Sequence, residues 1–253
     1  MPAFSTQAIV LQAWPTGEAD VLVDFLTPTQ GRLRGVAKGA KKSRKRFANC
    51  LGPACWIRLQ LYEKSTNPWV RLEAGELIDS FEAIRKDFRK WGVAGVLCEL
   101  TRELVPPRDP HPAVFELLRE SLQWLDGRGS AEEVGPIFQL KILRLAGYGL
   151  SLTACPVCGK AGNEFKGAVY SSLKAVLLCP ECCAGEEGLR LSPGTLHSLR
   201  QADRLEAGKA FRIRLDARTR QEAEELLTRV RRQVIGRELS SAYVLRQLQE
   251  PYG

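Results

Sequence analysis

The basic segment of this chain reads Gly31-Arg32-Leu33-Arg34-Gly35-Val36-Ala37-Lys38-Gly39 and then Ala40-Lys41-Lys42-Ser43-Arg44-Lys45-Arg46. Its first half alternates polar and apolar residues, which predicts a β-strand, and its second half, with glycine and serine among the bases, predicts a mobile loop. Residues 31–50 hold eight Lys or Arg and no acid. Such a run is either a solvated loop or a binding surface for a polyanion, whose charge offsets the repulsion between the bases.

The segments on either side of the basic strand predict a small barrel. Apolar and polar residues alternate, with interruptions, in residues 7–14, 20–27, 31–38, 55–62 and 69–75. Turn-forming residues such as Pro15-Thr16-Gly17 and Gly52-Pro53 separate these runs. Five short strands with a long basic connection between the third and fourth favour an OB-fold over residues 1–79, although an SH3-like barrel would leave the same pattern.

Aromatic residues occur beside basic ones in this predicted barrel. The aromatic residues are Trp14, Trp56, Tyr62 and Trp69, and the bases near them include Arg58, Lys64 and Arg71. Single-strand binding uses such pairs because any base can stack on a ring, at about 1 to 3 kcal/mol for each base. The alternative is that the rings fill the barrel core, and the strand register that would decide between the two is not set by sequence alone.

The remaining sequence predicts helices interrupted by a short insertion. Apolar residues recur at helical spacing in a segment that begins near residue 80 and ends before Pro106, and in residues 113–126, 132–146, 195–205, 217–237 and 241–248. We expect a helical domain in two parts, 80–150 and 191–253, whose helices pack together around an insertion at 151–190. The whole chain is therefore expected to be an α+β protein with several domains.

The insertion contains two pairs of cysteines at the spacing of a metal site. Cys155-Pro156-Val157-Cys158 is followed, after twenty residues, by Cys179-Pro180-Glu181-Cys182-Cys183. Two C-x-x-C pairs place four thiolates around one ion, so we expect Cys155, Cys158, Cys179 and Cys182 to bind a structural Zn²⁺ in a zinc ribbon. Cys183 is an alternative fourth ligand that the sequence leaves open.

Composition limits the function and the compartment. The chain has 253 residues, a net charge of +8 and a sequence pI of about 9.2, which favours an anionic partner. We expect a cytoplasmic protein with reduced thiols and no contact with membranes, because no leader or long apolar run is evident. We find no catalytic constellation, and therefore expect a protein that is not an enzyme.

The chain resembles the RecO family of bacterial recombination and repair mediators. The likeness lies in Gly17-Glu18-Ala19-Asp20, in Gly31 through Ala40, in Glu76-Leu77-Ile78-Asp79-Ser80-Phe81, and in Ala146-Gly147-Tyr148-Gly149-Leu150 before Cys155. The resemblance implies an N-terminal OB-fold, a helical domain and a zinc-finger insertion. It also implies that the protein binds single- and double-stranded DNA and anneals complementary strands. Together with RecR, the protein is then expected to load RecA onto DNA coated by single-strand-binding protein, and to contact the C-terminal tail of that coating protein. It further implies a location at the bacterial nucleoid.

We expect the DNA phosphates to be bound by the bases of the segment quoted first, namely Arg32, Arg34, Lys38, Lys41, Lys42, Arg44, Lys45 and Arg46. Two other classes of function remain as alternatives. One is a nucleic-acid-processing enzyme with a zinc ribbon, which would need a carboxylate cluster for Mg²⁺ or a nucleophilic lysine. The other is a transcription factor, which would prefer one duplex sequence.

Overall fold

The computed structural model describes residues 3–43, 45–62, 68–127, 129–164, 166–183 and 187–249. The chain packs as two compact units. We call Met1–Gly127 with Ser241–Gly253 the barrel unit and Arg128–Ser240 the ribbon unit. The expected domain limits at residues 79, 150 and 190 stay a prediction.

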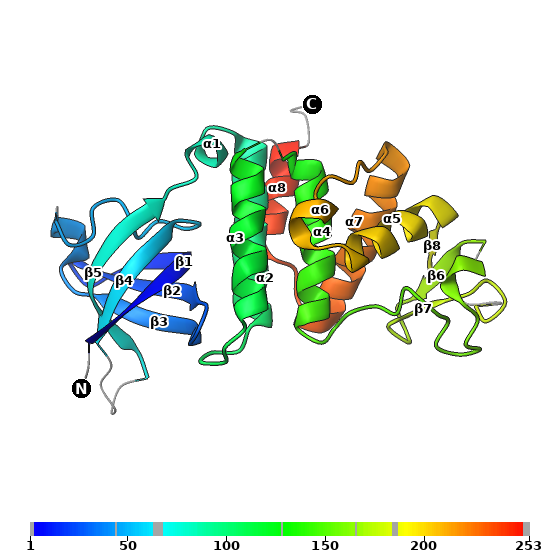
Figure 1. Cartoon of the computed structure of the whole chain (residues 1–253), viewed down its shortest axis with the longest axis horizontal. Coiled ribbons are helices and arrows are strands. Elements are labelled where there is room, and N and C mark those ends of the chain that lie inside the picture. Colours follow the sequence, from blue (N-terminus) through cyan, green and yellow to red (C-terminus); the bar gives the residue numbers. More distant parts are fainter. Residues whose placement is uncertain are drawn as a thin grey trace. The chain divides into compact units, whose positions relative to one another are not determined.

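Five strands form the closed barrel of the barrel unit (Figure 1). They are β1 (Ala3–Thr16), β2 (Asp20–Thr27), β3 (Gly31–Ala37), β4 (Trp56–Tyr62) and β5 (Val70–Asp79). Their order around the barrel is β1-β2-β3-β5-β4, and β3 pairs with β5 in parallel while the other neighbouring pairs are antiparallel. This Greek-key order confirms the predicted OB-fold, and the five strands correspond to the five predicted runs.

The alternation of β3 explains how the basic strand fits a barrel. Leu33 and Ala37 are buried in the core with Phe25, Ile57 and Leu72, whereas the two arginines on either side of Leu33 are only half-buried. Because side chains of a strand point alternately to opposite faces, the arginines lie on the outer face. The strand is thus an apolar wall on one side and a charged surface on the other.

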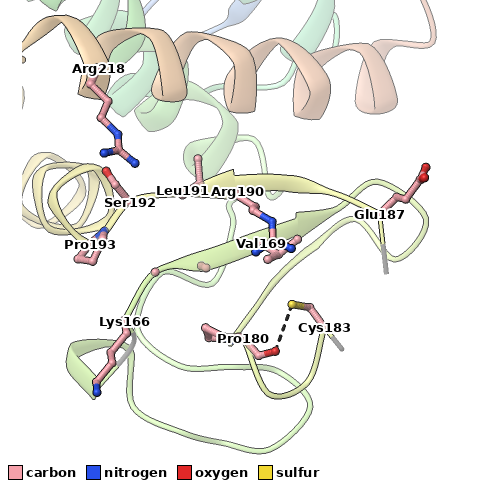
Figure 2. Close-up of a pocket in the computed structure, with 12 residues that line it drawn as sticks. Lys166, Val169, Pro180, Cys183, Glu187, Arg190, Leu191, Ser192, Pro193 and Arg218 are labelled. Atoms are coloured by element: carbon pink, nitrogen blue, oxygen red, sulfur yellow. Dashed lines mark hydrogen bonds between the residues drawn. The ribbon is translucent and has the colours of Figure 1, made fainter. Parts of the chain in front are cut away.

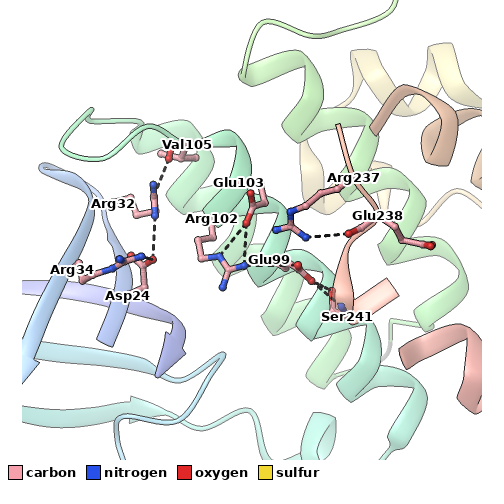
Figure 3. Close-up of polar contacts among 10 residues, drawn as sticks. All are labelled: Asp24, Arg32, Arg34, Glu99, Arg102, Glu103, Val105, Arg237, Glu238 and Ser241. Atoms are coloured by element: carbon pink, nitrogen blue, oxygen red, sulfur yellow. Dashed lines mark hydrogen bonds and ion pairs between the residues drawn. The ribbon is translucent and has the colours of Figure 1, made fainter. Parts of the chain in front are cut away.

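Four helices accompany the barrel, and two of them pack on its outer face. The four are α1 (Glu82–Arg85), α2 (Phe88–Leu104), α3 (Pro112–Asp126) and α8 (Ser240–Gln249). Helix α2 packs against β1 and α3, and α3 packs against β2. The carboxylate of Asp87 accepts hydrogen bonds from the N–H groups of Arg89 and Lys90. Asp87 therefore caps the N-terminus of α2 and separates this helix from the short α1. Glu99 on α2 accepts two hydrogen bonds from Ser241 and anchors the start of α8 (Figure 3).

The ribbon unit combines four helices with a three-stranded sheet. The helices are α4 (Ala131–Leu145), α5 (Pro193–Arg204), α6 (Ala207–Ala210) and α7 (Ala217–Ile235), and the strands are β6 (Ala168–Ser171), β7 (Val176–Leu178) and β8 (Leu189–Leu191). As expected, the helices before and after the cysteine segment pack together, with α4 and α5 against α7. The buried Tyr170 on β6 donates a hydrogen bond from its hydroxyl to Gln233 of α7. None of the described helices has the length and hydropathy needed to cross a membrane.

Candidate nucleic-acid interface and four-cysteine site

Two acidic residues of β2 face the bases of β3. Asp24 lies opposite Arg34 in the antiparallel register and is 1% exposed. One of its oxygens, Oδ2, accepts hydrogen bonds from both Arg32 and Arg34 at 3.1 Å (Figure 3). Arg32 also donates through Nε to the carbonyl of Val105, at the end of α2. The guanidinium of Arg32 is therefore largely committed to the protein, while Arg34 keeps 41% of its side chain exposed.

The second acid fixes the start of the basic loop. The Nζ atom of Lys38 lies 2.6 Å from Oδ2 of Asp20, and the N–H of Gly39 donates to the other oxygen at 2.8 Å. Hydrogen bonding to Lys38 and Gly39 lowers the pKa of Asp20, so this acid stays charged. Gly39 adopts a left-handed conformation with φ 66°, which lets the chain turn into the short 3-10 helix Ala40–Lys42. Because Lys38 is paired with Asp20, it adds less to the net positive charge of this surface than an unpaired lysine would.

The basic loop is tied to the barrel at several further points. Lys41 donates from its N–H to the carbonyl of Ala19 and from Nζ to that of Gly17, both in the β1–β2 turn. Arg46 donates to the carbonyl of Lys38 across the loop. These hydrogen bonds hold the described part of the loop to the barrel, whereas its glycine and serine residues predicted a mobile loop.

Several bases of the loop remain available to solvent. Lys41, Lys42, Lys45 and Arg46 are exposed. Within the described part of the chain, none of these four makes an ion pair with an acid. Arg44 belongs to the same predicted set and lies outside the described residues. The loop thus presents uncompensated positive charge, which is what a phosphate backbone binds.

Charges on the strands that follow the basic loop are balanced. On β4 and β5, Arg58 pairs with Glu76 at 2.9 Å and Arg71 pairs with Glu73 at 2.8 Å. The side chains of both pairs are exposed, and because each pair joins opposite charges, the pairs produce little net electric field at that surface. The excess positive charge of the barrel is therefore concentrated at the loop after β3.

The four aromatic residues that the sequence suggested for base stacking have different surroundings. Trp14, Trp56 and Tyr62 are half-buried, and Trp69 is 44% exposed. The guanidinium of Arg34 lies over the Trp14 ring, 5.5 Å from its centroid, whereas Arg119 of α3 covers Trp56. None of these four rings is fully buried in the barrel core. The Trp14 ring thus lies against a base of the predicted DNA-binding set.

The four predicted cysteines converge at one point of the ribbon unit. The sulfur atoms of Cys155, Cys158, Cys179 and Cys182 all lie within 4.8 Å of one another. Cys158 and Cys179, one from each pair, have sulfurs 3.6 Å apart. A tetrahedral ion with metal–sulfur bonds of about 2.3 Å needs sulfurs about 3.8 Å apart, so the cluster can hold a metal ion.

Backbone turns position these thiols. The N–H of Gly159 donates to the carbonyl of Cys155, and the N–H groups of Cys182 and Cys183 both donate to the carbonyl of Cys179. Burial disfavours the thiolate of Cys155, but the N–H groups of Cys179, Cys158 and Val157 outweigh it and lower its pKa to about 6. Burial raises the pKa of Cys179, and the hydrogen bond with the Cys158 thiol raises the pKa of Cys182. Since thiolate is the form that binds metals, a cation would bind the thiolate of Cys155 and displace the protons of Cys179 and Cys182.

Cys183 is not part of the cluster. Its thiol donates to the carbonyl of Pro180 at 3.3 Å and faces a separate cavity of about 560 Å³, which Val169, Arg190 and Leu191 also line (Figure 2). The geometry therefore favours Cys182 over Cys183 as the fourth ligand. All eight cysteines carry free thiols, and Cys98 is a buried core residue at 2% exposure.

Sequence reasoning missed Asp20 and Asp24. Both stand in a predicted strand, four residues apart and hence on one face, directly before a strand of alternating bases. Pairing the two strands as a hairpin would have placed acids opposite bases. This pairing pattern could have been found in the sequence. It would have predicted that part of the positive charge is neutralised within the barrel.

Comparisons with known proteins match both halves of the chain. Residues 1–81 match the family model described as Recombination protein O N terminal, and residues 85–242 match Recombination protein O C terminal. The chain is 36% identical over 215 residues to DNA repair protein RecO of Syntrophobacter fumaroxidans, covering 85% of each chain. It is 31% identical over 247 residues to the RecO of Syntrophus aciditrophicus, covering 96% of this chain and 95% of the relative. The chain, with its barrel unit and its ribbon unit, thus belongs to the RecO family of DNA repair proteins.

Proposed function

We propose that this protein mediates recombinational DNA repair by binding single- and double-stranded DNA and annealing complementary strands without ATP. Membership of the RecO family supports a mediator rather than an enzyme. The observation that carries the DNA-binding proposal is the exposed loop after β3, where Lys41, Lys42, Lys45 and Arg46 have no acid paired with them in the described residues. Arg44 is included in the proposed contact by its place in the sequence.

The bases of β3 have a smaller part in this proposal. Lys38 and Arg34 are exposed enough to approach a phosphate, but each already lies beside a β2 carboxylate. Arg32, at 15% side-chain exposure and bonded to Val105, serves mainly to hold the strand against α2. We therefore expect the loop to supply most of the phosphate contacts and the strand to supply fewer.

We propose Zn²⁺ as the ion of the four-cysteine cluster. Four thiolates suit zinc, and a closed four-sulfur shell leaves no position for a substrate. The ion would hold the two cysteine pairs together beside a three-stranded sheet whose strands have only three or four residues. Metal ligation replaces the hydrophobic core that such a small segment cannot build. Its role is thus to stabilise the ribbon unit.

We further propose the partners that family membership suggests, and a place of action at the bacterial nucleoid in the cytoplasm. With RecR the protein would help to load RecA onto DNA coated by single-strand-binding protein, and it would contact the acidic C-terminal tail of that protein. The net charge of +8 is compatible with both DNA and an acidic tail.

An annealing assay tests the proposed function. Two complementary labelled oligonucleotides, one coated with single-strand-binding protein, are mixed with and without this protein in the absence of ATP. We expect faster duplex formation with the protein present, and no change would refute annealing. Cleavage or joining of the strands with Mg²⁺ would favour the enzyme alternative, and strong preference for one duplex sequence would favour a transcription factor.

A further inference from the structure

The outer face of β1–β3 carries an apolar row between two ion pairs. In the strand register, Trp14 lies opposite Leu22 and Leu22 lies opposite Val36. All three side chains are half-buried. Directly opposed residues of antiparallel strands point to the same face, so the three form one continuous row. The face presents apolar surface to solvent, where a strand would ordinarily carry polar residues.

Charged pairs border this row on both sides. The next row toward the helices contains Asp24 opposite Arg34, with Oδ2 and Nη2 3.1 Å apart, and on the other side Asp20 pairs with Lys38. The outer face thus has an apolar row across three strands, with the half-buried Arg34 on one side and the exposed Lys38 on the other. That combination fits a nucleobase with a phosphate near each edge.

Arg34 also widens the shelf. Its guanidinium crosses β2 and lies 5.5 Å from the centroid of the Trp14 ring. A guanidinium and an indole are both planar, and each offers a face on which a base can stack. The guanidinium and the indole thus lie one over the other at the edge of the apolar row, where a base can add to the stack.

Asp24 holds this arrangement from below. It is 1% exposed, and its Oδ1 atom has no hydrogen-bond partner among the described residues, so its charge is compensated mainly by Arg32 and Arg34 (Figure 3). A buried carboxylate without competing donors attracts a neighbouring guanidinium strongly. Arg34 is therefore fixed over Trp14 instead of moving freely in solvent.

We propose that Trp14 and Arg34 form a stacking site for an unpaired base of a single strand, with Asp24 as its positioning residue. The inference rests on the proposed DNA binding and deepens it by naming the face of the barrel that contacts bases. Leu22 and Val36 form the floor of the site, and Lys38 lies beside the phosphate of the bound nucleotide. Because bases of a duplex are already stacked and paired, the site selects single strands.

Two oligonucleotides of equal length and charge test the site. One is an oligothymidylate and the other is an abasic strand with the same sugar-phosphate backbone. Wild-type protein should bind the oligothymidylate about fivefold or more tightly, because stacking of one base is worth that much or more. Trp14→Ala should bring the ratio of the two dissociation constants close to one, and Arg34→Lys should lower it because an ammonium is not planar.

Controls keep the outcome unambiguous. Phe88→Ala removes another aromatic ring of the barrel unit, one that is 80% exposed on α2, and should leave the ratio at the wild-type value. Trp14→Leu keeps apolar volume without a ring, and serves if Trp14→Ala does not fold. A ratio that stays at the wild-type value in the folded Trp14 variant would overturn the site. If wild-type protein binds both strands equally, the stacking site alone is wrong, whereas binding of neither strand in dilute buffer refutes the proposed function itself.

Discussion

Neutralising Lys42 and Lys45 together should weaken the salt dependence of DNA binding by a predictable amount. Both side chains are exposed and make no ion pair within the described residues, so their loss removes phosphate contacts without breaking a bond of the fold. We expect a change in stability of at most about 0.5 kcal/mol, as is usual for surface substitutions. The effect on binding can therefore be measured on a folded protein.

The magnitude follows from the number of available bases. If Lys41, Lys42, Arg44, Lys45 and Arg46 each neutralise one phosphate, the slope of log affinity against log salt on single strands is about −3.5, at about 0.7 for each contact. A fourfold rise in salt should then weaken wild-type binding about 130-fold. The variant Lys42→Ala with Lys45→Ala keeps three contacts, so the same change in salt should weaken its binding only about 18-fold.

Fluorescence anisotropy of a labelled single strand, titrated at several salt concentrations, measures both slopes. The matched control is Lys86→Ala with Lys209→Ala, which removes the same two charges from exposed lysines that pair with Glu82 and Glu206. This control should keep the wild-type slope. Equal slopes for the loop variant and the wild type would refute the placement of phosphate contacts on the loop, and equal losses in both double variants would show that net charge alone is responsible.

Three further outcomes test other parts of the structure. Cys182→Ser should lower the bound zinc measured by elemental analysis and reduce the melting temperature, whereas Cys183→Ser should retain the metal; the reverse result would contradict the cluster geometry. Gly31→Ala should unfold at a lower denaturant concentration than Gly17→Ala. Both positions have a positive φ, which costs an alanine about 1 to 2 kcal/mol, but only at Gly31 would the new Cβ clash with the Asp109 carbonyl. Equal losses of stability in the two variants would argue against that contact. Burial disfavours the charged form of Glu222, yet the Ser192 N–H, Arg218 and Thr195 outweigh it and lower its pKa to about 2. The stability from Glu222 should therefore be complete above the ordinary pKa of 4.5 and be lost as pH falls toward 2, so Glu222→Gln should flatten acid unfolding curves in that range, and unchanged curves would contradict the contacts.

The sequence predicted the barrel well because its strands have one face in the core. In β3 the buried and half-buried residues alternate without interruption, so periodicity alone identifies the strand. The strand order was a different matter. Parallel pairing of β3 with β5 joins residues that are far apart in the chain, such as Gly35 and Val70, and no local pattern reports it. The choice between an OB-fold and an SH3-like barrel therefore needed the structure.

The candidate site was predicted unevenly for a similar reason. The cysteine pairs carry their geometry in their spacing, because each C-x-x-C turn orients two thiols by its own hydrogen bonds. The charge of the basic segment depends instead on the neighbouring strand. Asp24 compensates Arg32 and Arg34 only because β2 and β3 pair in one particular register, and a slip by one residue would point this acid to the other face.

Asp20 and Asp24 thus divide the basic segment into two parts with different tasks. Bases next to a carboxylate gain less from a phosphate, since that phosphate must compete with an acid already in place. The paired bases Arg34 and Lys38 are, however, held in fixed positions at the edges of the Trp14 row, where geometry matters more than charge. The unpaired loop bases have the opposite character. We infer that the loop supplies the salt-dependent affinity for any nucleic acid, and that the strand face supplies the preference for unpaired bases.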